Sequence, residues 1–132
     1  MVSAGLLILR LVIGLSLAAH GAQKLFGWFG GYGLKGTGGW LESIGVKPGY
    51  SMALLAGLAE VSGGLLFASG LFLPVAAGLI AAVMLVAIWK VHFANGYWVT
   101  QNGYEYNVAI LAVVAGVALI GAGDYTIAEL FR

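Results

Sequence analysis

Four ionisable residues interrupt stretches of sequence that are otherwise long and apolar. Arg10, His20 and Lys24 occur in the first such stretch, and Glu60 is the sole charge in the second. An ionisable group inside a bilayer costs several kcal/mol, so it usually faces a protein interior and pairs with another group. At about 100° per residue, His20 and Lys24 lie about 80° and about 40° from Arg10 around a helix. This side of the first helix should therefore face inward, towards Glu60.

The depth of these groups along their helices predicts which of them meet. Glu60 lies about 15 Å along its helix from Tyr50, near the bilayer centre, at a rise of about 1.5 Å per residue. Arg10 approaches this level from the side of the chain termini, and His20 approaches it from the opposite side. We expect a buried Arg10–Glu60 pair with His20 beside it, a cluster whose catalytic role would be to relay protons. The alternative is an ion pair that only fixes the register of the helices.

A second, wetter group of residues belongs to the end of the spans that carries the long connections. Lys24, His92 and Glu105 have ionisable side chains there, and Trp40 and Tyr106 supply aromatic rings. We expect these five residues to bind a cofactor through its polar groups and its ring. The alternative is that the lysine snorkels to the interface and the aromatic rings form a belt at the lipid headgroups.

The two histidines also raise the question of a haem held by His20 and His92 from different helices. Two ligands alone do not define such a site, and we expect no metal centre. The chain has no cysteine, which excludes disulfide exchange, thiolate nucleophiles and iron–sulfur ligation by its own residues.

The composition of the chain requires a membrane around it. Of its 132 residues, 61% are hydrophobic and 8% are charged, and the mean hydropathy is +1.00. About a quarter of the residues in a soluble domain are charged, because they hydrate its surface. Lipid around the chain removes this requirement, so a water-soluble domain is excluded.

Four apolar stretches are candidates for the helices that position these residues, since about 20 apolar residues cross a bilayer. The expected spans are residues 4–27, 50–71, 74–93 and 105–122, within a single domain of residues 1–132. The predicted fold is all-α, an integral membrane four-helix bundle with a short interfacial helix in its first connection. Glycines at helical spacing, such as Gly57 and Gly64 beside Glu60, should let the helices approach closely.

Local signals place the connections between these spans. Gly70 suits the end of the second span and Pro74 suits the start of the third, so the two helices should form an antiparallel hairpin. Residues 37–45 have the pattern of a short interfacial helix, with Thr37 as its N-cap and Gly45 as its stop.

The ionisable residues and the glycines also carry a resemblance to a known family. The chain resembles the DoxX family of bacterial and archaeal membrane proteins over nearly all of its length. The residues that carry the resemblance are Arg10, His20-Gly21, Lys24-Leu25, segment 36–46, Glu60, Gly63-Gly64, Gly70, His92, Glu105-Tyr106-Asn107 and Gly123-Asp124-Tyr125. The resemblance implies a four-helix membrane bundle. The functional residues that it implies are Arg10, His20, Lys24, Glu60, His92, Glu105 and Asp124.

Members of that family include the membrane subunit of thiosulfate:quinone oxidoreductases, and others are linked to thiol and oxidative-stress complexes. Because this chain lacks cysteine, a thiol role of its own is not expected, and the resemblance leaves contact with a quinone or support of a partner. We therefore expect a redox-associated subunit of the cell (inner) membrane that contacts a quinone through its buried polar cluster. The sequence has no complete catalytic motif that would define the chain as an enzyme by itself.

Two other functions fit the same residues. The chain would be a structural or assembly subunit if its polar face binds another membrane protein. It would be a transporter if protons or a small solute pass along Arg10, Glu60 and His20, although four helices enclose little water. The expected partners are the lipid bilayer and either further copies of the chain or another membrane or redox protein, with no nucleic acid.

Overall fold

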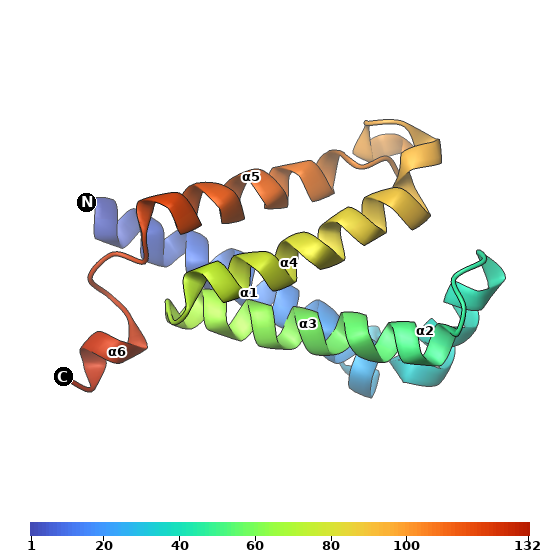
Figure 1. Cartoon of the computed structure of the whole chain (residues 1–132), viewed down its shortest axis with the longest axis horizontal. Helices are drawn as coiled ribbons and strands as arrows, with labels where there is room; N and C mark the ends of the chain where they lie inside the picture. Colours follow the sequence, from blue (N-terminus) through green and yellow to red (C-terminus); the bar gives the residue numbers. More distant parts are fainter.

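The chain folds entirely into helices, and the computed structural model describes all 132 residues (Figure 1). In chain order, the elements are α1 (Val2–Phe26), η1 (Trp28–Gly30), α2 (Gly33–Ser43), α3 (Gly49–Ser69), α4 (Leu73–Ala87), η2 (Ile88–His92), η3 (Phe93–Asn95), η4 (Val99–Gln101), α5 (Glu105–Ile120) and α6 (Ile127–Leu130). The long helices α1, α3, α4 and α5 form a four-helix bundle without any strand. The predicted all-α fold is confirmed.

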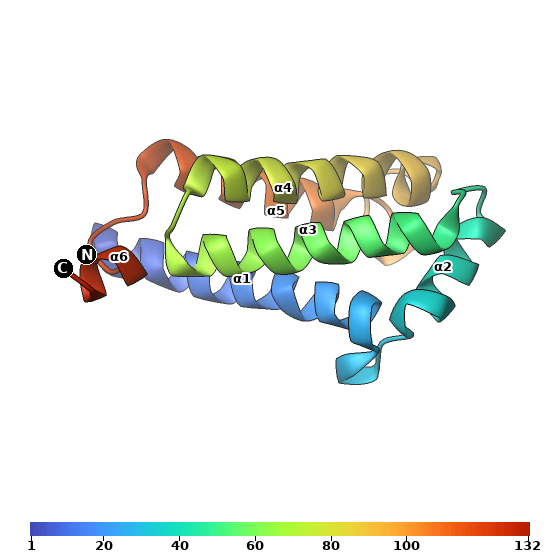
Figure 2. The same ribbon diagram turned by 60° about the horizontal axis from the view of Figure 1, so that its bottom comes forward.

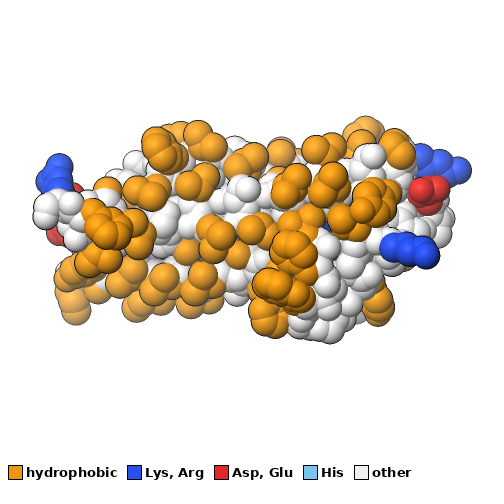
Figure 3. Space-filling view, turned by 90° about the horizontal axis from the view of Figure 1, so that it is seen from below, with side chains coloured by type: hydrophobic (Ala, Val, Ile, Leu, Met, Phe, Trp, Pro, Cys, Tyr) orange, Lys and Arg blue, Asp and Glu red, His pale blue; other side chains and the backbone are white.

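The length and polarity of the helices match a membrane. Three helical segments are long and apolar enough to cross it, namely α1, α3 and Leu73–Asn95, in which α4 continues through η2 and η3. The fourth helix, α5, is apolar and has 16 residues, a length of about 24 Å. Hydrophobic side chains cover the middle of the molecule, and charged side chains gather at its two ends (Figure 3). The chain is a multi-pass membrane protein whose helices contact the lipid bilayer.

Helices α1 and α3 lie side by side because glycines leave no side chain between them (Figure 2). A Cβ atom on Gly14 would lie 2.6 Å from the carbonyl oxygen of Gly64, and one on Gly21 would lie 2.7 Å from the carbonyl oxygen of Gly57. Both distances are shorter than van der Waals contact, so a larger residue would push the helices apart. Glu60 is buried on the same helix. The predicted groove of small residues beside this acid is confirmed.

The hairpin between α3 and α4 has the turn that its sequence predicts. Gly70 follows α3 with a φ of 78°, a left-handed conformation that glycine adopts without strain. Its N–H donates to the carbonyl oxygens of Leu66 and Phe67. Pro74 lies in the first turn of α4, where a backbone N–H would have no partner within the helix.

The end of the bundle that holds this hairpin and both chain termini is here called the terminal end. The apolar core runs from there to Met84 of α4 and Ile110 of α5. Phe67 of α3, Ile80 of α4 and Val114 of α5 are almost completely buried, and they form one cluster with Leu6 and Leu17 of α1. Helices α3 and α4 diverge away from the hairpin (Figure 1). The opposite end, which carries α2 and η2 to η4, is called the connection end.

Helix α2 differs in its start from the expected interfacial helix. It begins at Gly33 rather than after Thr37, and the Thr37 side chain caps nothing. Packing rather than capping fixes the helix, because Gly38 is buried against the backbone of Gly49 and Tyr50 at the start of α3. Gly45 follows the helix with a φ of 89°, so the predicted stop is confirmed.

Arg10 ties the terminal end together. It is 1% exposed, and its Nε and Nη2 atoms donate to the carbonyl oxygens of Phe67 and Ala68 at 3.3 and 3.0 Å. Its Nη1 and Nη2 atoms also donate to the carbonyl oxygens of Ala122 and Tyr125, each at 2.7 Å. A cation is favourable here, because the last carbonyls of a helix lack partners within it and carry partial negative charge. Arg10 therefore joins α1 to the end of α3 and to the segment after α5.

Replacing this anchor should loosen the terminal end. The Arg10→Leu variant should lose at least about 2 kcal/mol of stability, since it removes hydrogen bonds from a charged group to four buried or half-buried carbonyls. Thermal unfolding in mild detergent measures this loss, and limited proteolysis should cut the chain after Gly121 more rapidly. The exposed Arg132→Leu variant is the control and should unfold like the wild type. An Arg10→Leu protein as stable as the control would contradict the anchoring role.

Candidate functional site

A cavity of about 620 Å³ lies at the connection end, between the pair α1 and α3 and the pair α4 and α5. It is lined by 24 residues, of which 16 are hydrophobic, so its walls are apolar with a few polar groups. The other eight are Thr37, His20, Lys24, Glu60, Lys90, His92, Asn102 and Asn107, and the hydroxyl of Tyr106 adds one more polar group. An apolar pocket with a small set of convergent polar groups is the usual form of a small-molecule site.

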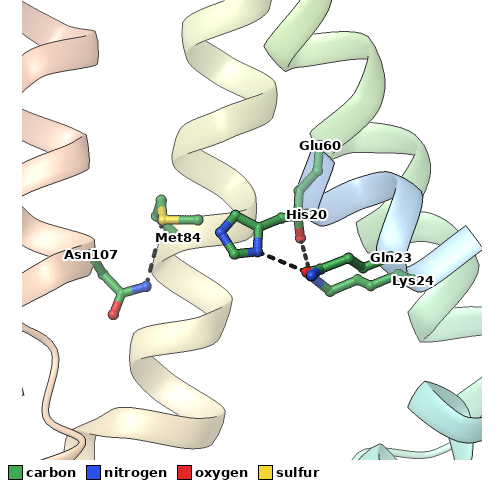
Figure 4. Close-up of polar contacts among 6 residues, drawn as sticks. All are labelled: His20, Gln23, Lys24, Glu60, Met84 and Asn107. Atoms are coloured by element: carbon green, nitrogen blue, oxygen red, sulfur yellow. Dashed lines mark hydrogen bonds and ion pairs between the residues drawn. The ribbon is translucent and has the colours of Figure 1, made fainter. Parts of the chain in front are cut away.

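The strongest interaction in this cavity is an ion pair between α1 and α3. The Lys24 Nζ atom lies 2.6 Å from Glu60 Oε1, and the two side chains are 30% and 3% exposed (Figure 4). Glu60 is about halfway along α3, so a charged pair lies deep in the membrane. Both side chains line the cavity, and Lys24 is the more exposed of the two.

His20 is held in one tautomer by a short chain of hydrogen bonds. Its Nδ1 atom donates to Gln23 Oε1 at 3.1 Å, because Gln23 Nε2 is committed to the carbonyl oxygen of Phe29 at 3.2 Å. The other ring nitrogen, Nε2, is then free to bind a ligand. Figure 4 shows the ring between Met84 and the Lys24–Glu60 pair, and all of these residues except Gln23 and Phe29 line the cavity.

Asn107 places an amide on the opposite wall of the cavity. It is 5% exposed, and its Nδ2 atom donates to Met84 Sδ at 3.5 Å (Figure 4). A thioether sulfur is a weak acceptor, so a ligand oxygen would be a better partner for this amide. The Asn107 amide can therefore leave the Met84 sulfur and donate to a ligand at little energetic cost.

The connection end of the α4 segment is wound as a π-helix, η2, which carries Lys90 and His92. The His92 Nδ1 atom donates to the carbonyl oxygen of Asn102 at 2.9 Å, which leaves Nε2 of this histidine unprotonated when the ring is neutral. The ammonium of Lys90 lies 4.0 Å from the centre of the Trp89 ring. Single π-helical turns in longer helices often occur at functional sites.

The cavity brings together six of the nine residues that the sequence analysis selected. These are His20, Lys24, Trp40, Glu60, His92 and Tyr106. Trp40 and Tyr106 are about half exposed, so their rings form part of its rim. The structure thus merges most of the two expected groups into one site.

Arg10 is not part of this site, and the expected Arg10–Glu60 pair is wrong. Arg10 binds carbonyls at the terminal end, and Glu60 binds Lys24. The reason is that side chains of an α-helix point back towards its N-terminus. Arg10 therefore reaches away from the bilayer centre, whereas Lys24, near the end of the same helix, reaches towards it.

Glu105 and Asp124 also lie outside the cavity. The Glu105 Oε1 atom accepts the backbone N–H of Val99 at 3.0 Å, so it stabilises the connection between η3 and α5 rather than a cofactor. Asp124 is exposed at the terminal end, where its backbone N–H donates to Ser3 Oγ at 3.1 Å. Of the expected second cluster, Lys24 and His92 line the same cavity but have different hydrogen-bond partners, and Glu105 lies outside it.

Two residues that the sequence analysis gave no role of their own contribute to the site. Asn107 is a polar residue in the first turns of an otherwise apolar helix, and that pattern could have singled it out. Gln23 has no such signal, because it lies near the end of α1, where polar residues are ordinary. Its role depends on the position of Phe29 in the following turn.

Comparison with known proteins agrees with this architecture. The family model of DoxX matches residues 5–93, well over half of the chain, and includes α1 to η2. The chain therefore belongs to the DoxX family. None of the curated proteins matches it, and none of the solved structures does.

A double-mutant cycle should reveal the coupling of Lys24 and Glu60. The Lys24→Met variant should lose about 2 kcal/mol of stability, because it leaves a buried carboxylate without its partner, with the loss reduced by the partial exposure of Lys24. Adding Glu60→Leu should restore most of the loss, since an apolar pair carries no desolvation cost. Unfolding of the single and double variants in the same detergent gives the coupling energy. Losses that simply add would contradict a direct ion pair.

Proposed function

We propose that this protein is a redox-associated subunit of the cell (inner) membrane that binds a quinone in the cavity at the connection end. One observation carries the proposal: a deeply placed Lys24–Glu60 ion pair and the free nitrogen of His20 face an otherwise apolar cavity. An ion pair beside a cavity of this size supports the binding of a ligand with both polar and apolar parts.

The residues of the cavity fit a quinone. A quinone ring needs an apolar slot, and its two carbonyl oxygens need hydrogen-bond donors. Lys24 supplies a donor on one wall, and the Asn107 amide supplies a donor on the other. The unprotonated Nε2 of His20 can accept a hydrogen bond from the hydroxyl of the reduced quinone. Trp40 and Tyr106 at the rim provide aromatic surface for the ring.

The ionisable groups are suited to hold and move protons. A bound quinone would supply two-electron redox chemistry coupled to protons. Glu60 and His20 have side chains that can accept or donate a proton close to such a ring, and Lys24 holds the Glu60 carboxylate in place. His92 and Lys90 line the cavity at the connection end, where a proton can exchange with water.

Electrons would have to come from a partner, because the chain has no cysteine and its side chains hold no group of three or more potential metal ligands. The proposal therefore includes a complex with another membrane or redox protein, or with further copies of the chain. In this arrangement the chain provides the quinone site and the partner provides the reductant.

Purification in mild detergent, followed by extraction and mass spectrometry, tests the proposal. The wild-type protein should retain about one quinone per cavity, and Glu60→Gln or His20→Ala should lower the occupancy at least about tenfold, because each removes a group of the polar wall. The Glu129→Gln variant is the matched control, since it makes the same substitution at the exposed terminal end. Its occupancy should equal that of the wild type.

Each other outcome of this experiment points to a different function. Phospholipid alone in the wild-type preparation, with no quinone after addition of excess, would reject the proposal and favour a structural or assembly subunit. A Soret band in the absorption spectrum would favour a haem between His20 and His92. Equal quinone occupancy in wild type and Glu60→Gln would place any quinone elsewhere.

A further inference from the structure

Helices α3 and α4 touch along only part of their lengths. A Cβ atom on Gly63 would lie 3.1 Å from Ile80 Cγ1 and 3.2 Å from Leu79 Cβ, so the helices are in close contact near their hairpin. One turn further from the hairpin, Ala59 of α3 and Ala82 of α4 line the cavity instead. The divergence of the two ribbons in Figure 1 begins in this region.

The gap between the two helices joins the cavity to the outer surface of the bundle. Several of the residues that line the cavity are also exposed on that surface. Leu55 is 59% exposed, Val86 is 52% exposed and Met52 is 38% exposed, and Ala82 is exposed as well. A residue that both lines a cavity and is open to the outside marks a mouth of that cavity. This mouth is here called the α3–α4 opening.

The residues of the α3–α4 opening are those expected of a surface that faces lipid. Its residues lie in the two membrane-spanning segments Gly49–Ser69 and Leu73–Asn95. None of them carries a charge, and they are Met52, Leu55, Ala56, Ala59, Ala82 and Val86. Alanines at positions 56, 59, 82 and 87 place small side chains between the larger Met52, Leu55 and Val86. The charged groups Lys24 and Glu60 lie on the far side of the cavity, on α1 and the inner side of α3.

We propose that the ligand of this cavity is a lipid-soluble molecule with a polar head and a long hydrocarbon chain, and that it enters sideways from the bilayer through the α3–α4 opening. The head meets Lys24, Glu60 and His20, and the chain remains between α3 and α4. For the identity of the head this inference rests on the quinone function proposed above. The inference adds the hydrocarbon chain of the ligand as a second determinant of specificity, and it excludes small water-soluble quinones as the physiological ligand.

The cavity has another possible route at the connection end, where Thr37, Lys90 and His92 line it. That route is polar and would favour small soluble ligands. The route through the α3–α4 opening is apolar and would favour a ligand with a hydrocarbon chain. Each methylene of that chain can pack against the alanines that line the gap. The two routes therefore predict opposite effects of a hydrocarbon chain on the affinity of a ligand: the polar route predicts weaker binding and the apolar route predicts stronger binding.

Binding in lipid nanodiscs discriminates between the routes. The probes are a benzoquinone with a long isoprenoid chain and the same ring without the chain. We expect the isoprenoid chain of the probe to strengthen binding. Ala59→Phe or Ala82→Phe should weaken binding of the long-chain probe at least about tenfold, since the phenylalanine ring fills the gap between α3 and α4. Binding of the short probe should change much less. Ala112→Phe is the matched control, because Ala112 is exposed on α5 and does not line the cavity.

The outcomes separate this inference from the function on which it rests. If the wild type binds both probes equally and Ala59→Phe has no effect, the opening is not the route, although the quinone function stands. If the wild type binds neither probe, the quinone function is rejected. In that case a second measurement, which needs no ligand, still decides whether the opening faces lipid.

That measurement is the collision rate of a nitroxide at a single introduced cysteine, which is free of background because the chain has no cysteine. A label at Ala59→Cys should collide readily with oxygen, which concentrates in lipid, and rarely with a polar nickel chelate. The label at Ala112→Cys should behave in the same way, and that at Thr37→Cys should favour the chelate. A water-like result at Ala59 would overturn the proposed opening whether or not a quinone binds.

Discussion

A polar or charged side chain within the bilayer must find its partners inside the protein, because the surrounding hydrocarbon offers none. The buried polar atoms of the bundle obey this constraint, since no buried side-chain nitrogen or oxygen lacks a hydrogen-bond partner. It does so in two different ways. Arg10 binds backbone carbonyls at helix ends, whereas Lys24 and Glu60 bind each other. The first solution closes the terminal end, and the second leaves a charged pair beside a cavity.

The glycine contact between α1 and α3 makes the second solution possible. Gly21 and Gly57 meet at close range, and Lys24 and Glu60 each follow by three residues on antiparallel helices. The two residues are therefore displaced in opposite directions from this contact, by about 9 Å in all at about 1.5 Å per residue. The long lysine side chain points back along its helix and bridges the distance. A bulkier residue at either glycine would separate the helices and break the pair without touching either charge.

Sequence alone was sufficient for the features that depend on local chemistry. Long apolar stretches predict the spans, and Gly70 with Pro74 predicts the hairpin, because these signals act within one or two turns. Most of the ionisable residues of the cavity were also predictable, since ionisable groups in apolar helices usually face the protein interior. The partner of Glu60 was not, because Arg10 and Lys24 share one side of α1 and only the direction of their side chains separates them. The role of Glu105 depends on the loop conformation at Val99, which has no sequence signal.

Unused hydrogen-bonding capacity distinguishes the residues that can act on a ligand from those that hold the fold. Arg10 is surrounded by fixed carbonyls, so it cannot turn to another partner without opening the bundle. His20 has one nitrogen committed to Gln23 and one free, and Asn107 donates only to the weak acceptor Met84. Both line the cavity, at the edge of the apolar core to which Met84 belongs. The divergence of two helices and the incomplete satisfaction of a few polar groups thus occur at the same place, which is what a ligand with a polar head and an apolar body requires.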